Sequence, residues 1–181
     1  STFTDDTTDF SVQVTAAKEA GADLVFLPIY YTPASMILMQ ANTMGYAPIF
    51  FGCDGLDGVI EKIGADNVSA TEGVMLLTPF NADAEDDATR SFVTKYQEKY
   101  GDIPNQFAAD AYDGVHAVAE ALKEAGLGVD ADPTEAAEKL SKAMLKITVD
   151  GLTGKLTWND KGQVQKEPTA YVITDGKYVQ A

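Results

Sequence analysis

Across residues 1–80, stretches with apolar residues at helical spacing alternate with short runs that are almost wholly apolar. Each run ends at a polar or glycine-containing break, and the next helical stretch begins there. This order predicts strands joined by crossover helices, and therefore a parallel sheet of βαβαβ type in an α/β fold. The expected elements are helix 10–20, strand 24–29, helix 33–44, strand 49–51, a short helix 56–63 and strand 74–80.

Capping residues set the expected helix boundaries. Asp9 is the predicted N-cap of the first helix, and Gly21 is its predicted stop. Thr32 is the predicted N-cap of the second helix, because Pro33 follows it and proline favours the first helical position. The continuous apolar character of the strands predicts that both faces of the sheet are buried.

The pattern changes at residues 81–87, a charged stretch without an apolar anchor. Helices are expected after it at about 88–100, 107–125 and 133–145. Strands are expected at 154–158, 169–174 and 177–179, the last two joined by a turn at Asp175-Gly176. Apolar residues of the middle helix follow a helical period: Phe107, Ala111, Tyr112, Val115, Val118, Ala119 and Leu122.

Charge and composition exclude several classes of function. The formal net charge of −15 repels a phosphate backbone and an anionic membrane surface, so nucleic acid is not an expected partner. Apolar residues make up 45% of the chain, which is enough for a real core, and no stretch approaches the ~20 apolar residues of a membrane span. The opening Ser-Thr-Phe-Thr alternates like the end of a strand, so we treat the chain as a fragment.

Two predicted strands are followed directly by residues suited to binding an ammonium group. Tyr30 and Tyr31 follow the first strand, and Asp54 follows the second within Cys-Asp-Gly. Ligands of open α/β sheets bind beyond the carboxyl ends of the strands, and neighbouring strands lie about 4.8 Å apart. A carboxylate can accept charge-assisted hydrogen bonds from an ammonium group, while an aromatic ring excludes water from the pair. The alternative is structural, since such a tyrosine often packs and aspartate before glycine often forms a turn.

Several segments together resemble the branched-chain amino acid binding proteins of ABC importers, and the resemblance covers nearly the whole chain. They are Asp9-Phe10-Ser11, Gly21-Ala22-Asp23, Tyr30-Tyr31, Phe51-Gly52-Cys53-Asp54-Gly55, Ala111-Tyr112-Asp113-Gly114-Val115 and Leu156-Thr157-Trp158-Asn159-Asp160-Lys161-Gly162. The resemblance implies ligand contacts by Tyr30, Asp54 and Phe107, with Asp54 holding the α-ammonium group. Many relatives carry glutamate where this chain has Asp54, so the carboxylate sits one methylene further back. A tighter closure, a water molecule or a larger ligand would fill that gap.

The same resemblance implies the architecture and the setting. The expected fold is a type I periplasmic binding protein, truncated to a three-layer parallel-sheet lobe with helices from the second lobe and C-terminal β-hairpins. Residues 1–80 would form the C-terminal lobe, 81–155 the helical part of the N-terminal lobe, and 156–181 strands that cross back. The expected partners are an amino acid and, through the full-length parent, an ABC permease. The expected location is extracytoplasmic, either periplasmic or lipid-anchored.

Other candidate chemistry is weaker. His116 is the single histidine, which leaves no histidine-based metal site or catalytic triad within the chain. Cys53 is expected to be a small buried residue at a strand end, and Asp54 with Asp57 is expected to cap a helix start and not to form a hydrolytic pair. The glycines match no nucleotide-binding pattern, so no cofactor and no enzymatic activity is expected.

Two alternatives stay open. The chain could be a sensor or binding module of the same fold for amides, ureas or aromatic acids, in which Asp54 would accept from a neutral N–H donor. It could also be a self-contained flavodoxin-like regulatory or enzymatic domain, which would be a compact monomer. A fragment with exposed lobe surface is instead expected to form homo-oligomers or to swap elements, and light scattering separates the two.

Overall fold

Strands from the first part of the chain pair in parallel in the computed structural model, which describes residues 2–128, 130–167 and 169–181. β1 (Leu24–Leu27) lies beside β2 (Ile49–Gly52), which lies beside β3 (Met75–Leu77). Two antiparallel strands, β7 (Ala170–Thr174) and β8 (Lys177–Gln180), complete a five-stranded sheet in the order β1-β2-β3-β7-β8. The predicted α/β class and the parallel βαβαβ order are therefore confirmed.

The chain divides into two compact units. Unit 1 comprises residues 1–78 and 169–181, and unit 2 comprises residues 79–168. The first boundary between the units, after residue 78, falls close to the change of pattern expected at residue 80. The strands of residues 156–181 were expected to cross back as one group, but they are divided between the two units. β5 and β6 belong to unit 2, and β7 and β8 belong to unit 1. The assignment of the units to particular lobes stays a prediction.

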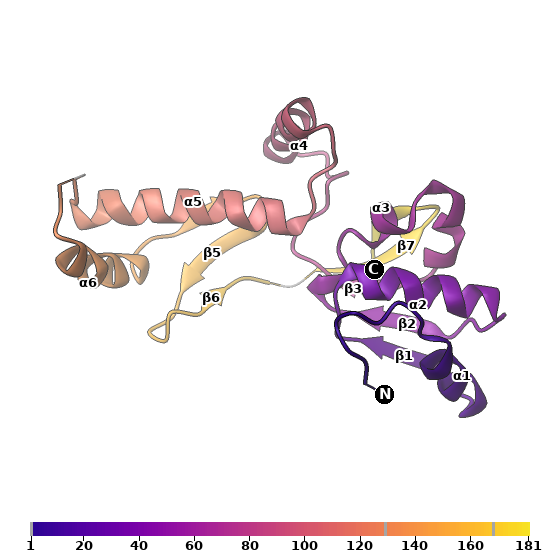
Figure 1. The fold of residues 1–181 in the computed structure, drawn as a ribbon. Helices are drawn as coiled ribbons and strands as arrows, with labels where there is room; N and C mark the ends of the chain where they lie inside the picture. Colours follow the sequence, from indigo (N-terminus) through magenta and orange to yellow (C-terminus); the bar gives the residue numbers. More distant parts are fainter. Residues whose placement is uncertain (1, 129, 168) are drawn as a thin grey trace. The chain divides into compact units, whose positions relative to one another are not determined.

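The helices of unit 1 cover one face of its sheet. They are α1 (Ser11–Glu19), α2 (Tyr31–Thr43) and α3 (Val59–Ile63), together with the 3-10 segments η1 (Asp54–Leu56) and η2 (Ala65–Thr71) (Figure 1). Their apolar residues join alternate residues of the strands in one core, which holds Phe10, Val14, Leu27, Ala34, Ile37, Leu38, Ala41, Phe50, Leu56, Val59, Ile63, Val74, Leu76 and Ile173.

The residues between these on the strands lie on the other face of the sheet. Leu24, Phe26, Ile49 and Val179 are each about half exposed there, at 51%, 50%, 53% and 50%. The strands are thus apolar on both faces, but the prediction that both faces are buried is wrong for the described residues, because one face is about half exposed. Within the described residues, however, the core joins α1, α2 and α3 to one of these faces, and the opposite face carries the exposed apolar side chains.

The helix boundaries differ from the predicted caps. α1 has Phe10 at its N-cap position, and Asp9 instead accepts a hydrogen bond from the Ser11 N–H at 2.9 Å. The prediction of Thr32 as an N-cap is wrong, since α2 begins at Tyr31 and has Tyr30 at its N-cap position. Pro33 is the third residue of α2 and is tolerated in this first turn, because the first N–H groups of a helix have no partner within it. Residues 2–4 form no strand, and Ser1 lies outside the described residues.

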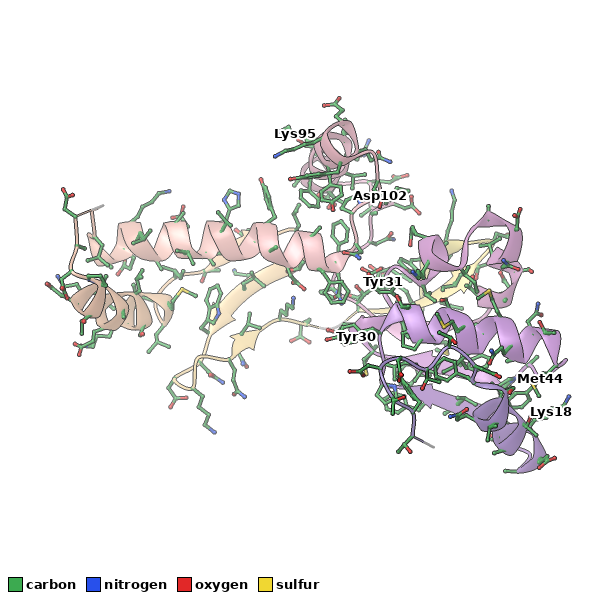
Figure 2. All side chains as sticks on the ribbon, in the orientation of Figure 1. Lys18, Tyr30, Tyr31, Met44, Lys95 and Asp102 are labelled. Carbon is green, nitrogen blue, oxygen red and sulfur yellow. The ribbon has the colours of Figure 1, made fainter. Side chains whose placement is uncertain are left out.

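Polar contacts fix α1 against α2. Lys18 Nζ donates to the Met44 carbonyl at 2.6 Å, so a cation sits at the C-terminal end of α2 (Figure 2). At the other end of α1, the Phe10 N–H donates to Gln40 Oε1 at 2.7 Å. Both contacts engage the C-terminal part of α2, and its N-terminus carries the residues that follow β1.

Unit 2 combines helices with a three-stranded antiparallel sheet. Its helices are α4 (Asp87–Tyr100), α5 (Gln106–Ala125) and α6 (Pro133–Met144), and its strands are β4 (Val149–Gly151), β5 (Gly154–Trp158) and β6 (Val164–Gln165) (Figure 1). Asp86, Asn105 and Asp132 cap the helices, each accepting from a backbone N–H of the first turn. Strand β5 was predicted at residues 154–158, while the short strands β4 and β6 were not predicted.

The apolar stripe predicted on α5 is largely exposed. Val115 and Val118 are 71% and 51% exposed, and α5 buries small and polar residues instead. Among these, Asp113 accepts hydrogen bonds from the Leu152 N–H, the Thr153 N–H and the Thr153 hydroxyl at 2.8, 2.9 and 2.8 Å. This buried carboxylate ties α5 to the turn between β4 and β5.

The two faces of the unit 1 sheet should respond differently to truncation. Leu38→Ala removes a side chain that is 1% exposed and should lower the free energy of unfolding by about 2–5 kcal/mol. Phe26→Ala on the other face should cost less than about 1.5 kcal/mol, because half of that side chain is already in water. Urea unfolding followed by circular dichroism measures both, and equal losses would contradict the one-sided core.

Candidate functional site

The ends of β1 and β2 lie side by side. The strands are parallel with Leu27 opposite Gly52, so the segments that follow them leave the sheet at the same edge. A Cβ atom added to Gly55 would lie 2.6 Å from the Ile29 carbonyl oxygen and 3.5 Å from the Tyr30 Cα. The loop that carries Asp54 therefore touches the segment that carries Tyr30. The prediction that the ends of these two strands are neighbours is confirmed.

Tyr30 stands at the N-terminal end of α2 with its side chain 66% exposed (Figure 2). It borders a hollow of about 410 Å³ that is also lined by Phe3, Asp5, Asp6, Thr7, Thr8, Pro28, Ile29, Thr32, Pro33 and Met36. Tyr31 is half-buried and packs against the core of unit 1. The two tyrosines thus separate into a packing residue and an exposed ring next to the strand end.

Asp54 opens the 3-10 segment η1, directly after β2, and its side chain is exposed. Its Oδ1 accepts a hydrogen bond from the Gly55 N–H at 3.0 Å. A carboxylate offers about four acceptor positions, so this local bond is compatible with further bonds to a ligand. The aspartate thus has the turn geometry of the structural alternative and also the exposure that ligand binding requires.

A buried polar network lies next to this loop, and the sequence did not reveal it. Asp57 is 3% exposed, and the Gly58 N–H donates to the Tyr178 hydroxyl at 3.2 Å. Burial raises the pKa of Tyr178, and the charge of Asp57 and a hydrogen bond to it raise that pKa further. The pKa of Tyr171 is also raised, first by burial and then by Asp57. Asp54 and Asp57 therefore occupy different environments, one exposed and one buried.

Of the remaining candidates, Phe107 and His116 belong to unit 2, and Cys53 belongs to unit 1. Phe107 is the second residue of α5 in unit 2 and is 36% exposed, and its contact with a ligand stays a prediction. His116 is exposed on α5, with its ring centroid 4.5 Å from that of Tyr112. Cys53 is half-buried at the end of β2. Among the residues that the structure describes, no cluster of metal-ligating side chains occurs.

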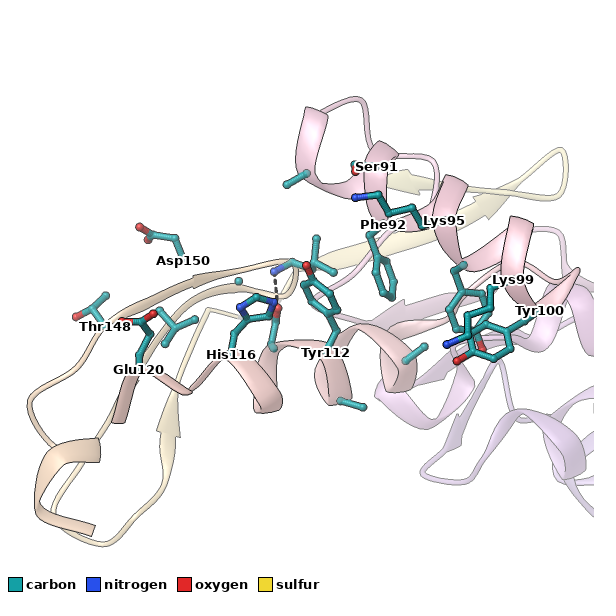
Figure 3. A pocket seen from close by; sticks show the side chains of 18 residues that line it. Ser91, Phe92, Lys95, Lys99, Tyr100, Tyr112, His116, Glu120, Thr148 and Asp150 are labelled. Atoms are coloured by element: carbon teal, nitrogen blue, oxygen red, sulfur yellow. Dashed lines mark hydrogen bonds between the residues drawn. The ribbon is translucent and has the colours of Figure 1, made fainter. Parts of the chain in front are cut away.

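Unit 2 has a groove of its own, of about 980 Å³, between α4, α5 and the edge strand β4 (Figure 3). Aromatic rings from α4 and α5 line this groove. The ring centroids of Phe92 and Tyr112 are 5.1 Å apart, and those of Tyr96 and Tyr100 are 4.7 Å apart. Sequence reasoning missed this groove, because its aromatic residues come from two helices whose packing the helical periodicity does not specify.

Comparison with known proteins places these features in a family. A sequence profile described as periplasmic binding protein matches residues 1–177. The leucine-, isoleucine-, valine-, threonine-, and alanine-binding protein of Pseudomonas aeruginosa is 28% identical over 158 residues, which are 87% of this chain and 39% of that protein. The chain therefore spans well under two thirds of the length of this curated relative.

Solved structures agree. A branched-chain amino acid transporter substrate binding protein of Streptococcus pneumoniae, in complex with isoleucine, is 27% identical with a TM-score of 0.78, over 99% of this chain and 51% of its own. A solute binding protein of an ABC transporter from R. palustris, in complex with benzoate, is 16% identical with a TM-score of 0.81, over 98% of this chain and 47% of its own. The second likeness concerns the fold alone.

The close approach of Gly55 to Ile29 can be tested by adding a methyl group. Gly55→Ala should lower the free energy of unfolding by about 1–3 kcal/mol, because the Cβ would push the two strand ends apart. Gly114→Ala is the matched control: nothing lies within 4 Å of its added Cβ in the middle of α5, so it should stabilise by about 0.5–1 kcal/mol. Thermal or urea unfolding measures both, and a neutral Gly55→Ala would show that the strand ends are not in contact.

Proposed function

Since the chain belongs to the periplasmic binding protein family, we propose that it carries part of the binding site for a branched-chain or related amino acid. Asp54 accepts hydrogen bonds from the α-ammonium group, and the ring of Tyr30 shields that ion pair from water. Phe107 supplies a further apolar contact. The contact of Gly55 with the Ile29–Tyr30 segment supports this assignment best, because it keeps the acid and the phenol at one edge of the sheet.

The chain on its own should bind such a ligand weakly. Asp54 and Tyr30 are both exposed, and an ion pair in water contributes only about 0–1 kcal/mol. A pair that is shielded on all sides contributes more, and two-lobed proteins achieve this by closing around the ligand. The proposed site therefore needs the N-terminal half that the longer relatives have. The groups that bind the α-carboxylate of the ligand are expected in that half.

The setting of the full-length protein is part of the same proposal. It would deliver its ligand to an ABC permease from an extracytoplasmic location, in the periplasm or anchored by a lipid. Support comes from the family and from the transporter protein of S. pneumoniae. None of the helices that the structure describes combines the length and the apolar character needed to cross a bilayer.

A second candidate ligand class is an aromatic acid, an amide or a urea. The R. palustris protein that matches this fold is in complex with benzoate. In such a ligand a neutral N–H or O–H group would donate to Asp54, or a bridging water would fill the space left by its short side chain. A thermal-shift screen of amino acids against benzoates and amides separates the two classes.

Substitution of Asp54 tests the proposed ammonium contact. In a full-length form that joins these residues to the N-terminal half, Asp54→Ala should weaken leucine, isoleucine or valine binding at least about 30-fold, because an uncompensated ammonium group would remain. Isothermal titration calorimetry measures this. Asp66→Ala, at an exposed aspartate of η2, is the control and should leave binding unchanged. Unaltered affinity in Asp54→Ala would refute the assigned role.

We also infer that the chain by itself associates through the uncovered face of the unit 1 sheet. Apolar residues at half exposure lie together on its strands, and such a patch is unusual on a monomer. Light scattering should show concentration-dependent growth in mass that Ile49→Lys reduces. Val12→Lys alters a residue of α1 that is 76% exposed and serves as the control. A monomer at every concentration would contradict the inference.

A further inference from the structure

The loop that carries Asp54 is held from two directions. On one side, Gly55 lies against the Ile29 carbonyl, as described above. On the other side, the Gly58 N–H donates to the Tyr178 hydroxyl at 3.2 Å. Tyr178 belongs to β8, the last strand of the chain, so the C-terminal hairpin reaches the loop that follows β2.

Tyr178 joins two neighbouring groups of the loop at once. Its hydroxyl accepts from the Gly58 N–H and donates to the carboxylate of Asp57, which is 3% exposed. Gly58 has a φ angle of 95°, in the left-handed region that favours glycine, and this conformation ends the loop before α3. A buried carboxylate needs such a donor, since an unsatisfied one is costly.

Backbone hydrogen bonds link Asp57, which Tyr178 holds in place, to Asp54. The Asp57 N–H donates to the Asp54 carbonyl at 3.0 Å, and the Leu56 N–H donates to the Cys53 carbonyl at 3.1 Å. These bonds close one tight 3-10 turn, η1. Because Asp54 and Asp57 are the two ends of that turn, a shift of Asp57 rotates the turn and moves the Asp54 side chain relative to Tyr30.

We propose that Tyr178 is a positioning residue for ligand binding, which holds Asp57 and Gly58 so that the Asp54 carboxylate stays beside Tyr30. The proposal rests on the ammonium-binding role of Asp54. It assigns a function to the hydroxyl of a residue in the C-terminal hairpin, about 120 positions away from the ligand contact in the chain. The ring of Tyr178 also packs near Tyr171, with 6.1 Å between the centroids, so the ring and the hydroxyl have separable roles.

The first experiment needs no ligand and uses the 181-residue chain. Tyr178→Phe removes the hydroxyl and keeps the ring, and hydrogen exchange of the Gly58 amide, followed by NMR, should accelerate about tenfold. Tyr171→Phe is the matched control on the neighbouring strand and should leave this exchange unchanged. Asp57→Asn, which weakens the acceptor side, should act in the same direction as Tyr178→Phe. Equal exchange in Tyr178→Phe and Tyr171→Phe would overturn the proposal.

The second experiment connects the hydroxyl to Asp54. In the full-length form, Tyr178→Phe should weaken leucine binding roughly three- to tenfold, measured by calorimetry. In an Asp54→Asn background the same change should have less than about a twofold effect, because the charge to be positioned is gone. A purely structural tyrosine would give the same loss in both backgrounds, and that result would overturn the positioning role.

The two experiments separate failure of this proposal from failure of the proposed function. If the full-length protein binds no amino acid, or binds it equally well after Asp54→Ala, the function is wrong and the positioning role falls with it. The hydrogen exchange of Gly58 still decides whether Tyr178 fixes the loop. The remaining case is that binding requires Asp54, but Tyr178→Phe weakens binding by the same factor with Asp54 present and with Asp54→Asn. The proposed function then stands, and the positioning role alone is refuted.

Discussion

Parallel pairing of β1 with β2 is the constraint on which the candidate site depends. With Leu27 opposite Gly52, each strand delivers the next residues to one edge of the sheet at strand spacing. A slip by one residue would turn the apolar side chains of the strands to the opposite faces. The core packing of Leu27 and Phe50 against α1 and α2 therefore also fixes where Tyr30 and Asp54 emerge.

The choice of residue at two positions adjusts this edge. Gly55 permits a backbone approach that alanine would prevent, so the loop after β2 can lie against the segment after β1. Asp54 is one methylene shorter than the glutamate that many relatives are expected to carry, and its side chain is exposed at the start of η1.

Much of the fold could be predicted, because it follows from local patterns. The apolar runs of the parallel strands, the turn at Asp175-Gly176 and the residues beyond the strand ends all carry signals within a few positions. The caps of α1 and α2 were wrong because Asp9 and Thr32 are good capping residues that tertiary packing places outside the cap position. The partnership of Asp57 with Tyr178 was missed, since side-chain contacts between distant segments leave no periodicity in the sequence.

The discontinuity of unit 1 has a consequence for synthesis on the ribosome. β3 pairs with β7, yet all of unit 2 lies between them in the chain, so the growing polypeptide exposes an unpaired edge at Met75–Leu77 until residues 170–174 emerge. Unit 2 is one uninterrupted segment of the chain, so it can fold before β7 is available to pair with β3. Residues 170–174 therefore pair with β3 only after unit 2 has been synthesised, and nascent chains that stop short of them would present a strand open to aggregation.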